Sequence, residues 1–186
     1  MNRSDDEVAM HTRVGNNYRN WIHTAQTLFA GSTILTREHA RARANLRRTG
    51  KAPIELLTVW TELMLAAFGI ECLVKAIWLK QGHQLARDGK YIPIVQNERH
   101  RLVPLCRAIG INMDAREQDA LERISIIGRT IGRYPIARRA YETQARQFYK
   151  HTGSPLSWSS EDDRIIECFV TRLKLMLRGR YVEATN

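Results

Sequence analysis

The fold is decided by residues 62–83, ELMLAAFGIECLVKAIWLKQGH. With the residues that follow Pro53, this segment predicts one long helix, because proline suits a first helical turn and no strong breaker comes before Gln81-Gly82. Its apolar side chains fall on most faces of that helix, so neighbouring helices are expected to cover it on several sides. The apolar positions are Leu56, Leu57, Trp60, Leu63, Met64, Ala67, Phe68, Ile70, Leu73, Val74, Ile77 and Trp78.

Charged residues within this segment argue against a membrane span. Glu62, Glu71 and Lys75 interrupt the apolar run, and such residues are rare and costly inside a bilayer. We therefore interpret the segment as a core helix. Glu71 and Lys75 are four positions apart with the acid first, the order that favours an ion pair on a helix surface. The pair is most simply structural, although a partly buried pair near a cleft would be a candidate site.

Two helices are expected before this one. Apolar residues recur every three or four positions over residues 18–30, as in one buried helical stripe. Thr36 is a suitable N-cap for a strongly basic helix that runs to about Arg48 and ends at Thr49-Gly50. Residues 1–15 show no such periodicity, and we expect them to form a frayed N-terminal arm.

Two further helices follow the central one. The first is short and spans about residues 99–109, where Gly110 ends it. The second runs from Asp114 to about Ile131, with Glu117 three residues after the cap, which is an aspartate version of the capping box.

The last helix is expected to begin at Ser159 or Ser160, because three acidic residues follow in its first turn. Residues 82–98 predict a loop with at most one short turn, and residues 132–158 predict a mixture of loop and short helix. No segment shows the alternation of a strand. The sequence therefore predicts an all-α bundle of five or six helices, in one domain over residues 16–180.

The composition favours an anionic partner. The 186-residue chain has a formal net charge of +10, and 23 of its 29 basic residues are arginine. The planar guanidinium group of arginine suits phosphates and carboxylates, although a GC-rich coding background would raise the same count without functional meaning.

The sequence lacks the features that mark several classes of protein. The three cysteines are an odd number with no Cys-x-x-Cys pair, which argues against a disulfide framework or a zinc ribbon. The six histidines form no ligand-spaced pair, and the chain has no phosphate-binding glycine loop and no Gly-x-Ser-x-Gly elbow. We expect no metal and no cofactor. The first residues lack the apolar run of a secretory signal, so a cytoplasmic protein is expected.

Two basic zones are candidate phosphate-binding surfaces. Residues 37–51 carry a local charge of +5 that includes Arg41 and Arg48, and they form either a phosphate-contacting face or a solvated surface helix. Residues 123–150 carry a local charge of +6 interleaved with aromatic residues. Tyr134 and its neighbours could stack on unpaired bases or anchor this segment to the core.

Four features, in this order, resemble the HEPN domain family. They are residues 62–83, the HRLVPL run at 100–105, Gly110, and the GRYP run at 132–135. In that family a helix with a glutamate-then-lysine signature precedes a His-x-Leu-x-x-Leu helix, a short acidic helix and an Arg-Tyr-Pro segment. The resemblance covers about residues 54–139. The matching residues are Glu71, Lys75, His100 and Arg133.

The resemblance implies an up-and-down helical bundle that often forms a two-fold dimer. Its members act as metal-independent ribonucleases, toxins, or accessory modules in defence and nucleotide binding. In active members a histidine follows an arginine after four to six residues. The arginine stabilises the developing phosphorane charge, and the histidine moves the proton from the ribose 2′-hydroxyl.

The histidine of this motif is missing where the family pattern would place it. The motif arginine maps onto Arg133, and the following positions 138–140 hold Arg138, Arg139 and Ala140. The favoured hypothesis is therefore a homodimeric, HEPN-like protein of a defence or toxin–antitoxin system. It would bind RNA or nucleotide phosphate through Arg133, Arg138 and Arg139 without cutting.

Alternatives remain open from the sequence. Arg146 and His151 have the spacing of the active motif and would make the protein a ribonuclease or toxin, whereas Arg19 and His23 are one residue too close. A third hypothesis is a module that binds an acidic protein, such as an antitoxin. His100 either caps its helix or bonds across the core, or else contacts a ligand.

Overall fold

The computed structural model describes residues 3–50, 58–130, 146–147, 152–153 and 157–179. It confirms the all-α class, since six helices dominate the described residues and the strands form only two short hairpins. The helices are α1 (Arg3–Gly15), α2 (Tyr18–Thr49), α3 (Val59–Lys80), α4 (Leu102–Ala108), α5 (Ala115–Arg129) and α6 (Ser160–Leu177). The strands are β1 (Ala86–Arg87), β2 (Lys90–Tyr91), β3 (Arg146–Gln147) and β4 (Thr152–Gly153).

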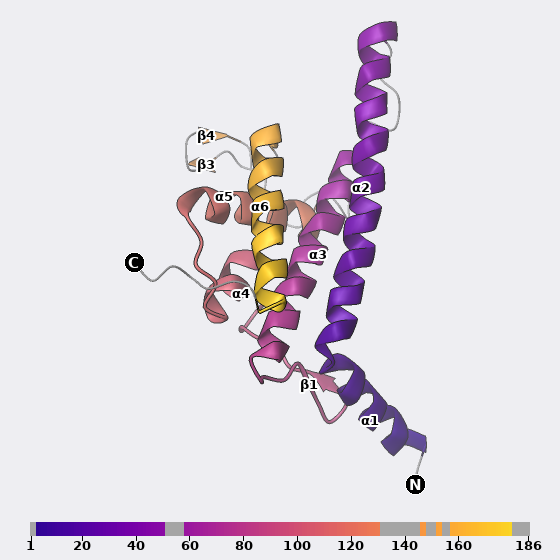
Figure 1. Cartoon of the computed structure of the whole chain (residues 1–186), viewed down its shortest axis with the longest axis vertical. Helices are drawn as coiled ribbons and strands as arrows, with labels where there is room; N and C mark the ends of the chain where they lie inside the picture. The colour runs from indigo at the N-terminus through magenta and orange to yellow at the C-terminus, as the bar shows by residue number, and fades with distance from the viewer. Residues whose placement is uncertain (1–2, 51–57, 131–145, 148–151, 154–156, 180–186) are drawn as a thin grey trace.

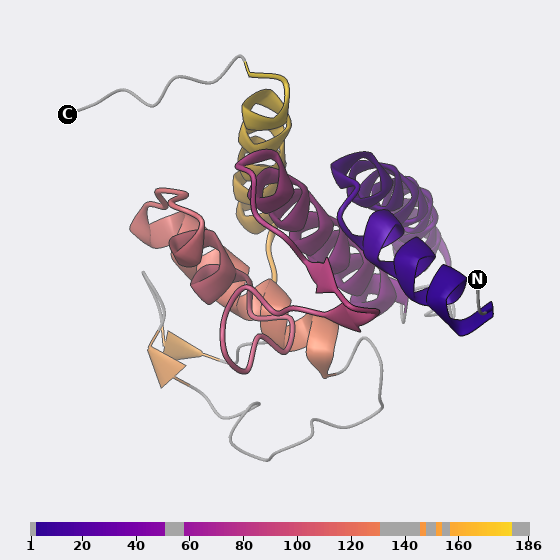
Figure 2. The same cartoon turned by 90° about the horizontal axis from the view of Figure 1, so that it is seen from below.

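Helix α3 is the centre of the bundle. Helices α2, α4, α5 and α6 all pack against it, and Figure 2 shows α3 between α2 on one side and α4 and α5 on the other. Ile70, Leu73 and Val74 are almost completely buried in one hydrophobic core with side chains from α2, α4, α5 and α6. The prediction that neighbours cover this helix on several sides is confirmed. Among the described helices, none combines the length and the hydropathy that a bilayer crossing requires.

The close approach of α2 and α3 depends on a glycine. The ring of Phe29 from α2 lies over Gly69 of α3, and a Cβ atom at that position would be 2.8 Å from two ring carbons. Such a contact is shorter than van der Waals packing allows, so a side chain there would push the two helices apart.

The N-termini of α5 and α6 form the predicted caps. Asp114 accepts hydrogen bonds of 2.8 Å from the backbone N–H groups of Arg116 and Glu117, and the Glu117 carboxylate accepts one from the N–H of Asp114. Ser159 and Asp162 form the corresponding capping box on α6. Both helices therefore begin where the local sequence alone placed them.

The expected frayed arm at residues 1–15 is wrong for residues 3–15, because these form α1. The hairpin of β1 and β2 holds the end of this helix in place: the Asn16 amide donates to the carbonyl of Ala86 at 2.7 Å, and its oxygen accepts from the N–H groups of Leu85 and Ala86. The N–H of Gly89 also donates to the Thr12 hydroxyl at 3.1 Å. These contacts come from residues about 70 positions away, so the local sequence pattern does not predict them.

The expected break before Thr36 is also wrong, because α2 is one continuous helix of 32 residues. The Thr36 hydroxyl does not cap a helix. It donates to a Glu62 oxygen on α3 at 2.8 Å and lies 3.0 Å from the carbonyl of Ser32. Contacts with α3 thus keep α2 helical in a segment where the apolar periodicity of α2 itself is weak. Residues 82–98 contain the β1–β2 hairpin instead of only a loop.

Replacing Gly69 with alanine is expected to lower the free energy of unfolding by about 1–3 kcal/mol, since the new methyl group meets the Phe29 ring. Gly31→Ala on α2 is the matched control. Its Cβ would meet only the end of the Leu65 side chain, at 3.2 Å, and alanine favours a helix by up to about 1 kcal/mol over glycine. Urea unfolding measures the free energy of unfolding of both variants. Equal changes in the two variants would contradict the close packing of Phe29 on Gly69.

Candidate functional site

A buried group of charged side chains joins α3 to the segment before α4. Lys75 forms an ion pair with Glu71, one turn earlier on α3, and its Nζ also lies 2.8 Å from Oε1 of Glu98. The second oxygen of Glu71, Oε2, is 2.7 Å from Nδ1 of His100. These residues, with Tyr91, are called the Glu71 cluster below.

The remaining partners of the cluster come from β2, from the segment that follows it and from α2. The Tyr91 hydroxyl lies 2.8 Å and 3.0 Å from the two oxygens of Glu98, and the backbone N–H of Ile94 donates to Oε2 of the same carboxylate at 3.0 Å. The Lys75 ammonium also lies over the rings of Trp21 and Tyr91, 5.2 Å and 5.0 Å from their centres. An ammonium over an aromatic face is attracted by the ring, so Lys75 has favourable contacts on several sides.

The cluster is charged in spite of its burial. Glu71, Lys75 and Glu98 are 5%, 6% and 8% exposed. Burial opposes ionisation of Glu71, but the hydrogen bond from His100 and the charge of Lys75 outweigh it and lower the pKa of Glu71. Burial likewise opposes the charge on Lys75, but the Glu71 charge and hydrogen bonds to Glu71 and Glu98 raise the pKa of Lys75. The Glu71–Lys75 pair therefore exists as predicted, but it is buried and not on the helix surface.

His100 is a partly exposed member of the cluster, as is Tyr91. The His100 side chain is 41% exposed, and its ring centre lies 5.0 Å from that of Phe68. It bonds across to α3 and does not cap α4, whose N-cap residue Arg101 makes no side-chain cap bond. With Nδ1 directed at Glu71, the imidazole is held in one orientation, and its Nε2 makes no hydrogen bond within the described part of the chain.

The backbone around His100 is strained. Asn97, Arg99 and His100 all have positive φ angles, of 57°, 36° and 59°, a region that costs free energy for residues with a side chain. Arg99 and Arg101, on either side of His100, are exposed. The arrangement presents a fixed imidazole between two exposed arginines, a combination able to contact an anion such as a phosphate.

A second candidate surface is the arginine end of α2, defined here as Arg37, Arg41, Arg43, Arg47 and Arg48. All five are exposed, and Figure 1 shows this end of α2 extending past the other described helices. Glu38 is the only acidic residue from position 31 to 50, and it pairs with Arg41. Arg43 donates to the His39 ring and Arg48 to the Asn45 side chain.

Most of the other predicted site residues lie outside the described residues. Arg133, Tyr134, Arg138, Arg139 and His151 belong to this group. The backbone of Arg146 is in β3, where it pairs with Gly153 of β4, and its side chain likewise lies outside what the structure describes. The pairing of Arg146 with His151 and the clustering of the three arginines around Tyr134 stay predictions.

Arg123 corrects the charge count of the second basic zone. It is 3% exposed and forms ion pairs with Asp119 on its own helix and with Asp162 on α6. It also donates to the carbonyl of Ser157 at 2.8 Å. Arg123 thus fastens α5 to α6 and adds nothing to a phosphate-binding surface, because its charge is compensated inside the protein.

Sequence reasoning named Glu71, Lys75 and His100 but missed Glu98, Tyr91 and Trp21. The available signal was a lysine on a helix that is apolar all round, because a buried ammonium needs compensating acids or aromatic faces. Nothing local indicates that Glu98 supplies the second acid, since it comes from a loop 23 positions further along the chain.

Comparisons of the chain with protein-family models, with curated proteins and with solved structures found no match. The HEPN resemblance therefore stays a prediction. Within the described residues, no three histidine, cysteine, aspartate or glutamate side chains are grouped so that they could hold one metal ion.

Replacing Lys75 with methionine is expected to lower the free energy of unfolding by about 3–5 kcal/mol, since it leaves the buried carboxylates of Glu71 and Glu98 without their shared cation. Lys90→Met removes a charge from an exposed position on β2 and is expected to change stability by no more than about 0.5 kcal/mol. Urea unfolding of both variants measures the difference. A loss of similar size in both would contradict the role of Lys75.

The lowered pKa of Glu71 predicts a pH dependence of stability. A carboxylate with a folded-state pKa below its ordinary value of 4.5 stabilises the protein fully above that pH, and the contribution is lost as the pH falls through the folded-state pKa. Glu71→Gln is therefore expected to flatten the fall in stability between about pH 4.5 and 2. The exposed Glu122→Gln is the control. Equal acid profiles for wild type and Glu71→Gln would contradict the ionised, stabilising state of Glu71.

Proposed function

We propose that the protein binds RNA through its phosphates, and that the arginine end of α2 makes the contacts. The observation that carries this proposal is the exposure of five arginines on a projecting helix end with a single acidic neighbour. Arg41 and Arg48, the two candidates that the sequence named in this zone, are among them. The net charge of +10 favours the same partner.

Helix geometry places three of these arginines on one outward stripe. At 3.6 residues per turn, Arg37, Arg41 and Arg48 fall within a sector of about 40°. The buried His39 and Ala42 lie on the opposite side of the helix, so the stripe faces away from α3. From the first arginine to the last it extends about 17 Å at 1.5 Å per residue.

Binding without cleavage is part of the proposal. The sequence lacks a histidine at positions 138–140, where the resemblance to the HEPN family would place the group that moves the proton. Arginine forks also bind phosphate oxygens bidentately without any chemical step. Both points support a binding protein over a ribonuclease.

The salt dependence of RNA binding tests the proposal. For single-stranded RNA followed by fluorescence anisotropy, the double variant Arg41→Gln/Arg48→Gln is expected to flatten the plot of log affinity against log salt by about 1.4, or about 0.7 for each phosphate that the variant no longer neutralises. The control is Arg13→Gln/Arg116→Gln, which removes the same charge from exposed positions on α1 and α5. An unchanged slope in the first variant, or an equal change in the control, would refute the proposed surface.

The same titration tests the other arginines that the sequence named. A flatter slope for Arg138→Gln/Arg139→Gln would add that segment to the binding surface. Electrophoresis of the RNA after binding is expected to show intact strands. Shortened strands that are absent with His151→Ala would favour the ribonuclease hypothesis instead.

A further inference from the structure

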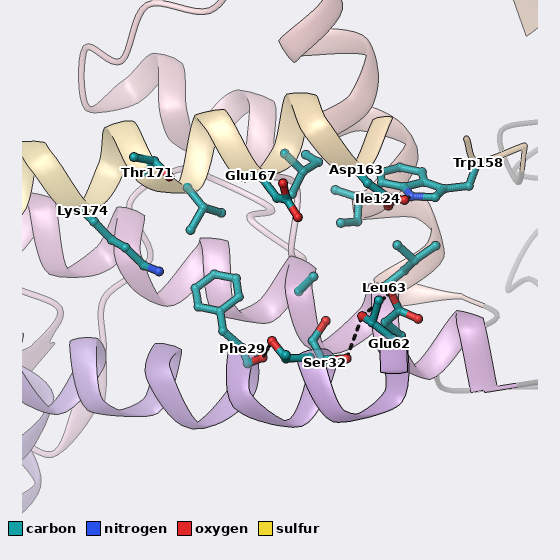
Figure 3. A pocket seen from close by; sticks show the side chains of 15 residues that line it. Phe29, Ser32, Glu62, Leu63, Ile124, Trp158, Asp163, Glu167, Thr171 and Lys174 are labelled. Atoms are coloured by element: carbon teal, nitrogen blue, oxygen red, sulfur yellow. Dashed lines mark hydrogen bonds between the residues drawn. The ribbon is translucent and has the colours of Figure 1, made fainter. Parts of the chain in front are cut away.

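A groove with a volume of about 450 Å³ lies between α2 and α6, with α3 as its floor. Figure 3 shows side chains from both helices directed into it. Its size falls within the range of small-molecule sites. The side chains used below are Phe29, Glu62, Leu63, Asp163, Glu167 and Lys174.

The groove is acidic in a protein that is otherwise basic. Glu62 from α3 and Asp163 and Glu167 from α6 line it, against Lys174 as its one fully basic side chain. The protein as a whole has a net charge of +10. The groove therefore attracts cations at a place where most of the molecule repels them.

Glu62 is the member that most needs a cation. Its side chain is only 12% exposed, and it accepts one hydrogen bond, from the Thr36 hydroxyl. The imidazole of His39 lies beside it, with Nδ1 3.8 Å from Oε2 of Glu62. Burial and the neighbouring charge of Arg43 lower the pKa of His39, so this imidazole is neutral near pH 7. Burial raises the pKa of Glu62, and the charge of Arg43 opposes this only in part. Among the described residues, Glu62 thus has no cationic side chain within ion-pair distance apart from the neutral His39, which is costly for a nearly buried carboxylate.

The apolar surface of the groove fits an aliphatic chain. Phe29 and Leu63 line it together with Ala66 and Val170. At one end the Lys174 ammonium already lies over the Phe29 ring, 5.3 Å from its centre. The groove therefore already accommodates one alkylammonium group against this aromatic face.

The distribution of carboxylates in the groove favours a cation with separated charges over a single metal ion. They form no group able to hold one metal ion, and Asp163 already accepts a hydrogen bond of 2.7 Å from the Trp158 indole. Glu62 and Glu167 lie on opposite sides of the groove, on α3 and α6 (Figure 3). A ligand with two separated positive charges and an apolar middle matches this distribution.

We propose that the groove between α2 and α6 binds an aliphatic diamine or a longer polyamine. One ammonium group contacts Glu62 and the other contacts Glu167, while the methylene groups lie against Leu63 and Phe29. None of the five arginines at the arginine end of α2 lines this groove, and the inference does not depend on RNA binding.

Titration calorimetry with 1,4-diaminobutane and with spermidine, at low salt and without RNA, tests this inference. Both are expected to bind. Butylamine, with one ammonium group, is expected to bind at least about tenfold more weakly, since it makes one charge-assisted hydrogen bond fewer. The uncharged 1,4-butanediol is expected not to bind.

Matched variants locate the binding. Glu62→Gln keeps the hydrogen bond with Thr36 and is expected to weaken binding of the diamine by about tenfold or more. Glu167→Gln is expected to weaken it similarly. Glu122→Gln makes the same change in net charge at an exposed position on α5 and is expected to leave the affinity within about twofold.

A variant that fills the groove tests the inference independently, in case a charge variant does not fold. Ser32→Leu narrows the groove from the α2 side and is expected to abolish binding, with circular dichroism confirming the fold. Any of three results would overturn the inference. These are no binding of either amine at millimolar concentration, equal affinity for butylamine and diaminobutane, and wild-type affinity in both Glu62→Gln and Ser32→Leu.

Discussion

The ammonium of Lys75 connects several elements of this structure at one buried point. It lies between the carboxylates of Glu71 and Glu98 and over the rings of Trp21 and Tyr91. Through these contacts it connects α3 with α2, with β2 and with the segment that leads into α4. A buried charge is stable only when every side of it is satisfied, so the four elements must meet in one arrangement. The cluster therefore acts as a specific junction in a core that is otherwise apolar.

The caps and the central helix could be predicted because their causes are local. Asp114 and Ser159 bond to backbone groups within three residues, and the apolar run of α3 is visible in the sequence itself. The N-terminal helix and the continuity of α2 could not be predicted in this way, because Asn16 and Thr36 form hydrogen bonds with residues far along the chain. A helix that is held by distant contacts leaves little trace in its own periodicity.

The same distinction applies to the candidate site. The spacing of Glu71 and Lys75 indicated an ion pair, but neither its burial nor its second acid, Glu98, can be read from that spacing. Counting charges was misleading for Arg123, which is compensated by Asp119 and Asp162 inside the protein. Arg172 is another basic residue of this kind, since it bonds to Glu117 and to the carbonyl of Asn112. Where an arginine lies decides its role more than how many there are.

The uninterrupted length of α2 has a mechanical consequence. One helix of 32 residues, about 48 Å long, contacts the buried ammonium at Trp21, forms a wall of the groove at Phe29 and carries exposed guanidinium groups beyond residue 36. Because the helix is continuous between these points, a small tilt at either lower contact would displace the charged end by a larger distance than the contact itself.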